Sequence, residues 1–95
     1  MTHNQYTDYK DYLKYKDSIF YYNEAKKLQS NSSTDYELIS KTFYKSIILN
    51  KNNVDSEYAI RNMISQGQIT TQECLTAKIT ARAELLQCYS VTDLK

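Results

Sequence analysis

Residues 34–67 decide the fold of this chain, and they read TDYELISKTFYKSIILNKNNVDSEYAIRNMISQG. A polar start is followed by a helical apolar stripe, an asparagine-rich turn and a second stripe that ends at the only glycine of the chain. Asparagine and glycine tolerate the left-handed backbone conformation in which helices commonly end. The stretch therefore predicts two helices joined by a short turn, at about 35–50 and about 55–66.

Capping boxes mark the starts of two predicted helices. Thr34 precedes Glu37 by three residues, which predicts that the threonine hydroxyl accepts from the Glu37 N–H while the Glu37 side chain reaches back to the cap. Thr70 and Glu73 repeat this spacing. The residues after Thr70 predict a fourth helix at about 71–89, with a buried stripe of Leu75, Ile79, Ala83, Leu86 and Tyr89.

The residues before this core predict a first helix at about 5–28, because glycine and proline are absent there. Its apolar residues recur at helical spacing in two seams, Tyr12, Tyr15, Ile19 and Tyr22 in one, and Tyr9, Leu13 and Phe20 in the other. The pair Asp17 and Ser18 leaves open a break near residue 17.

The composition supports an all-α fold. Strands need turn residues at short intervals, and this chain has no proline and one glycine. We predict a single domain over residues 1–95, an antiparallel bundle of four helices that is frayed at 1–4 and 91–95. No apolar run approaches the roughly 18 residues that a membrane span requires, and the polar first ten residues lack the apolar core of a signal peptide.

The two cysteines predict a cytoplasmic protein. Cys74 and Cys88 lie on one predicted helix, fourteen residues apart, so their Cα atoms are about 21 Å apart at 1.5 Å per residue. A disulfide requires Cα atoms within about 7 Å. We therefore expect two reduced thiols, as in cytosolic proteins.

The sequence lacks the residues of an enzyme site. His3 is the only histidine, and it lies in a terminus where a general base has no fixed position. Cys74 in a first helical turn leaves a nucleophilic role open, although small buried cysteines are more often core residues. Clustered Cys and His ligands and a glycine-rich phosphate loop are absent from the sequence. We predict no catalysis, no metal and no cofactor.

The middle of the chain, at about positions 36–75, resembles a tetratricopeptide-type helical hairpin. The run Phe43 to Asn53 is similar to the second helix of such a repeat and its turn, and Tyr58 to Gly67 to the first helix of the next. Arg61 and Lys51 depart from the small residue and the proline of that pattern. The resemblance implies a scaffold that binds other proteins and carries no catalytic residues.

The tyrosine content is high, ten in 95 residues, and a row of four lies near the N-terminus. Tyrosines spaced by three turn about 60° around a helix at each step, so the row covers about half the circumference. One internal core cannot bury them all, and tyrosine is enriched in protein interfaces. We predict a partner-binding surface of Tyr6, Tyr9, Tyr12 and Tyr15. The alternative is that these tyrosines stand partly exposed on an ordinary amphipathic helix.

These observations predict a non-catalytic protein-binding module, with another protein or a second copy of the chain as partner. An adaptor, a chaperone or an inhibitor or immunity protein fits this description. The abundance of residues with A/T-rich codons is compatible with a phage, plasmid or other mobile element. The alternative function is a small nucleic-acid-binding transcriptional regulator, which the net charge of +1 does not favour.

Overall fold

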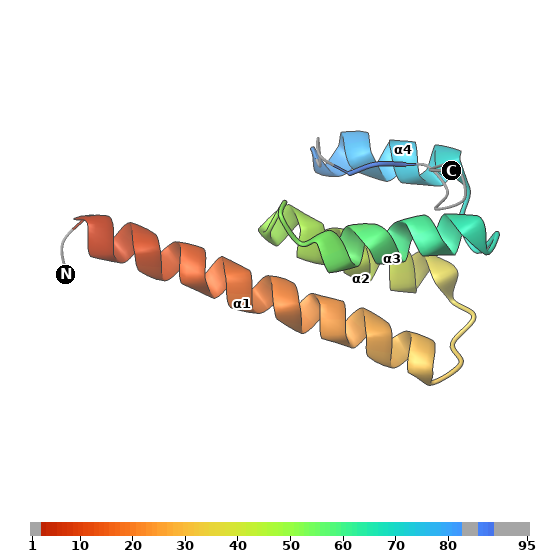
Figure 1. The fold of residues 1–95 in the computed structure, drawn as a ribbon, viewed down its shortest axis with the longest axis horizontal. Coiled ribbons are helices and arrows are strands. Elements are labelled where there is room, and N and C mark those ends of the chain that lie inside the picture. The colour runs from red at the N-terminus through yellow and green to blue at the C-terminus, as the bar shows by residue number, and fades with distance from the viewer. Residues whose placement is uncertain (1–2, 83–85, 89–95) are drawn as a thin grey trace.

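The computed structural model describes residues 3–82 and 86–88, and the side chains of residues 9–80, 82 and 86–88. The described ranges contain four helices and no strand: α1 (His3–Ser30), α2 (Tyr36–Leu49), α3 (Val54–Ser65) and α4 (Thr71–Ala81). The prediction of an all-α fold is confirmed, and the four helices form a bundle. Figure 1 shows α1 on one side, α2 and α3 in the middle, and α4 on the other side. The fraying predicted for residues 91–95 falls outside the described residues.

α2 is the central helix, because it contacts each of the other three. Its N-terminus differs from the predicted capping box. Asp35 rather than Thr34 is the cap, and its Oδ1 accepts a hydrogen bond from the Leu38 N–H at 3.1 Å. Aspartate caps a helix at least as well as threonine, and its charge is favourable at the positive end of the helix dipole. Glu37 instead forms an exposed ion pair with Lys41, with 2.8 Å between Oε1 and Nζ.

The turn before α3 and the stop after it lie where the sequence predicts them. Asn53 caps α3 by accepting from the Ser56 N–H at 3.1 Å, so the helix begins one residue before Asp55. Gly67 follows the helix with a φ of 71°, and its N–H donates to the Ile64 carbonyl at 3.0 Å. Side chains are strained at this φ, which is why glycine ends the helix here.

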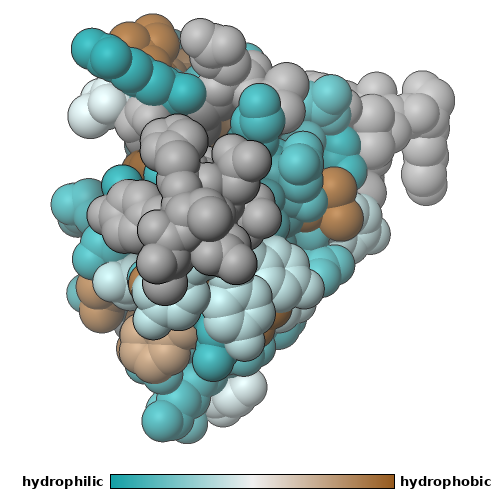
Figure 2. Space-filling view, turned by 90° about the vertical axis from the view of Figure 1, so that its left-hand side faces the viewer, coloured by the Kyte–Doolittle hydropathy of each residue, from teal (hydrophilic) through white to brown (hydrophobic). Residues whose placement is uncertain are grey.

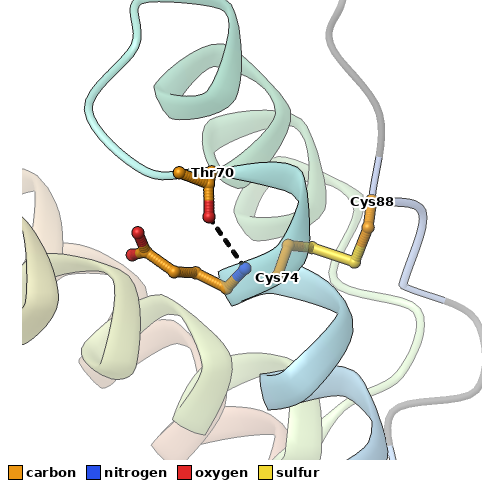
Figure 3. Close-up of a disulfide and its surroundings, with 4 residues drawn as sticks. Thr70, Cys74 and Cys88 are labelled. Carbon is orange, nitrogen blue, oxygen red and sulfur yellow. Dashed lines mark hydrogen bonds between the residues drawn. A yellow bond between two sulfur atoms is a disulfide. The ribbon is translucent and has the colours of Figure 1, made fainter.

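α4 begins as predicted and ends earlier than predicted. The Thr70 hydroxyl accepts from the Glu73 N–H at 3.0 Å, which confirms the second cap (Figure 3). The helix ends at Ala81, and Arg82 adopts a left-handed φ of 54°. Neither glycine nor proline occurs after Gly67 to signal this end. The predicted extension of the helix to residue 89 is therefore wrong.

The shorter α4 changes the predicted buried stripe. Leu75 and Ile79 are 40% and 78% exposed, whereas the prediction placed both in the core. Leu86 is fully buried as predicted, but it belongs to a non-helical segment. Ala83 and Tyr89 fall outside the described residues. Burial on this side of the bundle therefore comes partly from the chain after α4.

A disulfide joins Cys74 to Cys88, which corrects the prediction of two reduced thiols. That prediction assumed one straight helix through both cysteines. Because α4 ends at Ala81, the chain returns, and the two Cα atoms lie 5.5 Å apart (Figure 3). Next to Cys88, the Gln87 Oε1 accepts a hydrogen bond from Arg61 Nη1 of α3 at 3.0 Å. The segment after α4 is thus fastened to the bundle.

The hydrophobic core lies around α2. Its buried apolar side chains are Ala25, Ile39, Phe43, Tyr44, Ile47, Ile60, Met63, Ile69, Cys74 and Leu86. Burial of this apolar surface is the main favourable term in folding. None of the helices in the described ranges combines the length and apolarity that crossing a membrane requires.

A cluster of hydrogen-bonded serines joins three helices inside this core. Ser18 Oγ of α1 donates to the Ser46 carbonyl of α2 at 2.7 Å and accepts from Asn53 Nδ2 at 2.8 Å. The Ser46 hydroxyl also bonds the Ser56 hydroxyl of α3. All three serines are fully buried, and the bonds satisfy their hydroxyls. α1 runs through Ser18 without the break left open near residue 17.

Candidate functional site

α1 is twice as long as the helix it packs against. At 1.5 Å per residue its 28 residues span about 42 Å, and the 14 residues of α2 span about 21 Å. Ser18 contacts Ser46, and the ring of Tyr22 lies 5.9 Å from that of Phe43, so the helices run antiparallel. In this register Leu49, the last residue of α2, is opposite about the midpoint of α1. The N-terminal half of α1 projects past α2 (Figure 1).

Six large apolar side chains between residues 9 and 20 of α1 are 40–55% exposed: Tyr9, Tyr12, Leu13, Tyr15, Ile19 and Phe20. Figure 2 looks at this end of the molecule and shows pale aromatic and brown apolar side chains gathered among teal polar ones. Three of the four predicted partner-binding tyrosines are therefore exposed together on one helix. The side chain of the fourth, Tyr6, falls outside those described.

Helix geometry explains why these side chains are uncovered. Each residue of an α-helix turns about 100° around the axis. Phe20 is two residues from both Ser18 and Tyr22, which face α2, so it points away from α2. The apolar side chains on this far side (Tyr9, Leu13 and Phe20) and on one of its edges (Tyr12 and Ile19), together with Lys16, form what we call the outer face. Leu13, Ile19 and Phe20 were missed as candidate site residues, although their direction relative to Ser18 follows from the spacing.

Charges of both signs surround the outer face. The exposed ionic side chains of this part of α1 are Lys10, Asp11, Lys14, Lys16 and Asp17. Lys16 Nζ lies 5.5 Å from the centre of the Tyr12 ring, a cation–π contact that keeps the lysine stem along the apolar surface. Because the charges are mixed, this part of α1 has no extended positive patch. Proteins that bind nucleic acid use such a patch to attract the negatively charged phosphates.

Two recesses lie where the projecting half of α1 leaves the bundle. One, of about 450 Å³, is bounded by Asp11, Lys14 and Tyr15 of α1 and by residues 48–52. The other, of about 400 Å³, lies between residues 15–23 of α1 and the turn that leads into α3. Tyr15 borders both, so the third tyrosine of the row faces the recesses, and Ile19, at the edge of the outer face, also lines the second recess. Recesses of this size accommodate one or two side chains of a binding partner.

A separate apolar groove of about 550 Å³ lies between α2 and α4, and Tyr44 lines it. Tyr44 is 8% exposed, and its hydroxyl has no hydrogen-bond partner among the described residues. Burial, and to a smaller extent the negative charge of Glu73, raise the pKa of Tyr44 to about 12. The phenol therefore remains uncharged at physiological pH.

The described residues contain no cluster of three or more His, Cys, Asp or Glu side chains that suits a metal ion. Cys74, for which the sequence left a nucleophilic role open, is bonded to Cys88 in this structure. The side chain of His3 is outside those described. Comparisons with models of known protein families, with curated proteins and with solved structures gave no match.

Proposed function

We propose that this chain is a non-catalytic protein-binding module and that the outer face of α1, with the adjoining recesses, is its contact surface. The observation that carries the proposal is the run of six half-exposed apolar side chains on a single helix. Contiguous exposed apolar patches on small proteins commonly mark interaction sites. Tyrosine and phenylalanine are also the side chains that contribute most to contacts between proteins.

The shape of α1 supports the same function. A projecting helix presents its side chains at fixed spacing, so a partner helix or groove can read them as a rigid pattern. The tetratricopeptide-type resemblance of residues 36–75 agrees with a binding role and remains a proposal. The roles of adaptor, chaperone and inhibitor, and an origin in a mobile element, remain proposals as well.

A double substitution on the outer face tests the proposal. Tyr9→Ser with Tyr12→Ser removes two exposed rings without touching the buried core, so the fold is retained. Tyr58→Ser is the matched control, because Tyr58 is a 49% exposed tyrosine on α3. In a pull-down from the source cell, we expect the tagged wild-type chain and the Tyr58→Ser variant to capture the same protein. If the partner is a second copy of the chain, both should self-associate equally. The double variant should lose that contact, and identical behaviour of all three chains would refute the proposal.

Salt dependence separates this function from the alternative of a nucleic-acid-binding regulator. Contacts to phosphate release counterions, so their affinity falls steeply as salt rises. Apolar contacts made by the outer face should weaken little between 50 and 200 mM salt, in the range where phosphate contacts lose most of their affinity. Retention of the partner after nuclease treatment gives an independent reading.

The cellular location stays a prediction. The sequence favoured the cytoplasm because two cysteines on one helix cannot bond, and the disulfide removes that argument. Disulfides persist mainly in oxidising compartments, and cytosolic thiols are usually kept reduced. Labelling of free thiols in the protein taken directly from its source cell measures which state prevails there. A fully labelled Cys74 supports the cytoplasm, and an unlabelled one supports an oxidising compartment.

A further inference from the structure

We infer that the partner of the outer face is a second copy of the same chain, bound antiparallel about a two-fold axis that passes near residues 14 and 15 of α1. The inference rests on the proposed function and adds the identity of the partner. Two-fold homodimers are the commonest oligomers, and they require a surface that is complementary to itself. The outer face meets this requirement in two pairs of side chains, and the charged residues along its edge supply a third pair.

Tyr9 and Phe20 form the central apolar pair of the proposed dimer. In an antiparallel helix pair related by a two-fold axis, two positions equally distant from the axis, one on each copy, are level with each other. Tyr9 and Phe20 point in nearly the same direction, since eleven residues at about 100° each return to within about 20°. Tyr9 of one copy thus lies opposite Phe20 of the other, with Leu13 and the stem of Lys16 between the two aromatic contacts. Aromatic rings paired in this way contribute beyond their buried area.

The two edges of the outer face differ, and each edge is complementary to itself. Tyr12 and Ile19 are seven residues apart and share one edge, so Tyr12 meets Ile19 of the second copy. Lys10 and Asp17 are also seven residues apart and share the opposite edge, so Lys10 meets Asp17 of the second copy. Both ionic side chains are exposed and lie outside the bundle contact. The midpoints of these pairs differ by two residues, about 3 Å, which an inclined helix crossing accommodates.

The available area predicts a dimer of modest affinity. Large aromatic side chains bury about 150–250 Å² each, and those of the outer face are about half exposed. Two copies together therefore bury roughly 1,000 Å², at the lower limit of specific interfaces. We expect a dissociation constant on the order of micromolar, so that the dimer forms at high concentration and dissociates on dilution.

Charge reversal at the ionic edge tests the inference. Lys10→Asp and Asp17→Lys each place like charges at both symmetry-related contacts, whereas the combined swap restores two opposite-charge pairs. Sedimentation of the wild-type chain, the two single variants and the swap over a concentration series measures the dissociation constant of each. Arg82→Asp, an exposed reversal directly after α4 and so on the opposite side of the bundle from α1, controls for the change in net charge.

We expect each single reversal to weaken the dimer about tenfold, from two exposed ion pairs exchanged for repulsions. The swap should return the dissociation constant to within about threefold of wild type, and Arg82→Asp should leave it unchanged. A swap that dimerises no better than the single variants would overturn the inference. A wild-type chain that stays monomeric throughout the series would also overturn it. In that case, loss of another protein from the Tyr9→Ser, Tyr12→Ser variant would still uphold the proposed function.

Discussion

The two halves of α1 contrast sharply. In the C-terminal half, Ala25 is fully buried and the ring of Tyr22 lies on Phe43. In the N-terminal half, aromatic residues are just as frequent, but Tyr9 and Tyr12 are more than 50% exposed. The helix continues unchanged, and only the presence of α2 beside it differs. Aromatic content therefore indicates packing against the same chain only where a second helix is long enough to provide it.

Two phenylalanines test the underlying difference between an aromatic ring packed against a second helix and one that is not. Phe43 is fully buried against α1, whereas Phe20 is 55% exposed. Phe43→Ala leaves a cavity and should lower the free energy of unfolding by about 3–5 kcal/mol. Phe20→Ala removes a half-exposed ring and should lower it by less than about 0.5 kcal/mol. Urea unfolding of the two variants in dilute solution measures both values, and equal losses would refute the difference in packing between the two rings.

The next largest effect is expected from the disulfide, which lies in the bundle and not in the projecting half of α1. The Cys74–Cys88 disulfide closes a short loop, with a sequence separation of 14. A loop of this length gives about 2–3 kcal/mol of stability. Cys88→Ser should lower the free energy of unfolding by that amount, and a reductant should bring the wild-type chain to the same value. A reductant that destabilises Cys88→Ser as well would contradict this explanation.

A smaller effect, opposite in sign, is expected at Tyr44. Tyrosines of the outer face are half exposed, but the Tyr44 hydroxyl is buried without a partner among the described residues. An unsatisfied buried polar group costs about 1–3 kcal/mol, and phenylalanine fills almost the same volume. Tyr44→Phe should therefore raise the free energy of unfolding by about 1 kcal/mol. Tyr12→Phe, on the outer face, is the control and should leave stability nearly unchanged.

The pH dependence of stability gives a separate signal at Tyr44, which develops only above pH 10. Its pKa is raised to about 12 in the folded chain, from 10 in the unfolded one. Between pH 10 and 12 the unfolded phenol loses its proton and the folded one keeps it, so stability is intact below pH 10 and falls as pH rises. The stability advantage of Tyr44→Phe should therefore widen across this interval. An advantage that does not change with pH would indicate that the hydroxyl reaches solvent.

Local signals predicted much of the fold. Gly67 and the Thr70 cap act through their own backbone and neighbouring residues, so their positions follow from a few residues of sequence. The end of α4 does not, because Arg82 is not a helix breaker and adopts its left-handed conformation where the chain turns back. The disulfide depended on that turn and was missed with it.

The candidate site was predicted in part. Spacing alone identified a tyrosine row too wide for one core, and Tyr9, Tyr12 and Tyr15 are exposed in the structure. The extent of the outer face required knowing which side of α1 contacts α2. That side is marked by Ser18, a buried polar residue whose partners, Ser46 and Asn53, are distant in sequence. A serine that is buried through distant partners has no signature in a hydrophobicity pattern.

The serine cluster holds the projecting helix at a point near its middle. Ser18 lies about 22 Å along α1 from the first helical turn, so each degree of tilt at the cluster moves that tip by about 0.4 Å. Three hydroxyl groups and one amide side chain thus help to set the angle at which a much longer helix leaves the bundle. We expect the exchange of one of these small groups to change the direction of the aromatic row without altering a residue in it.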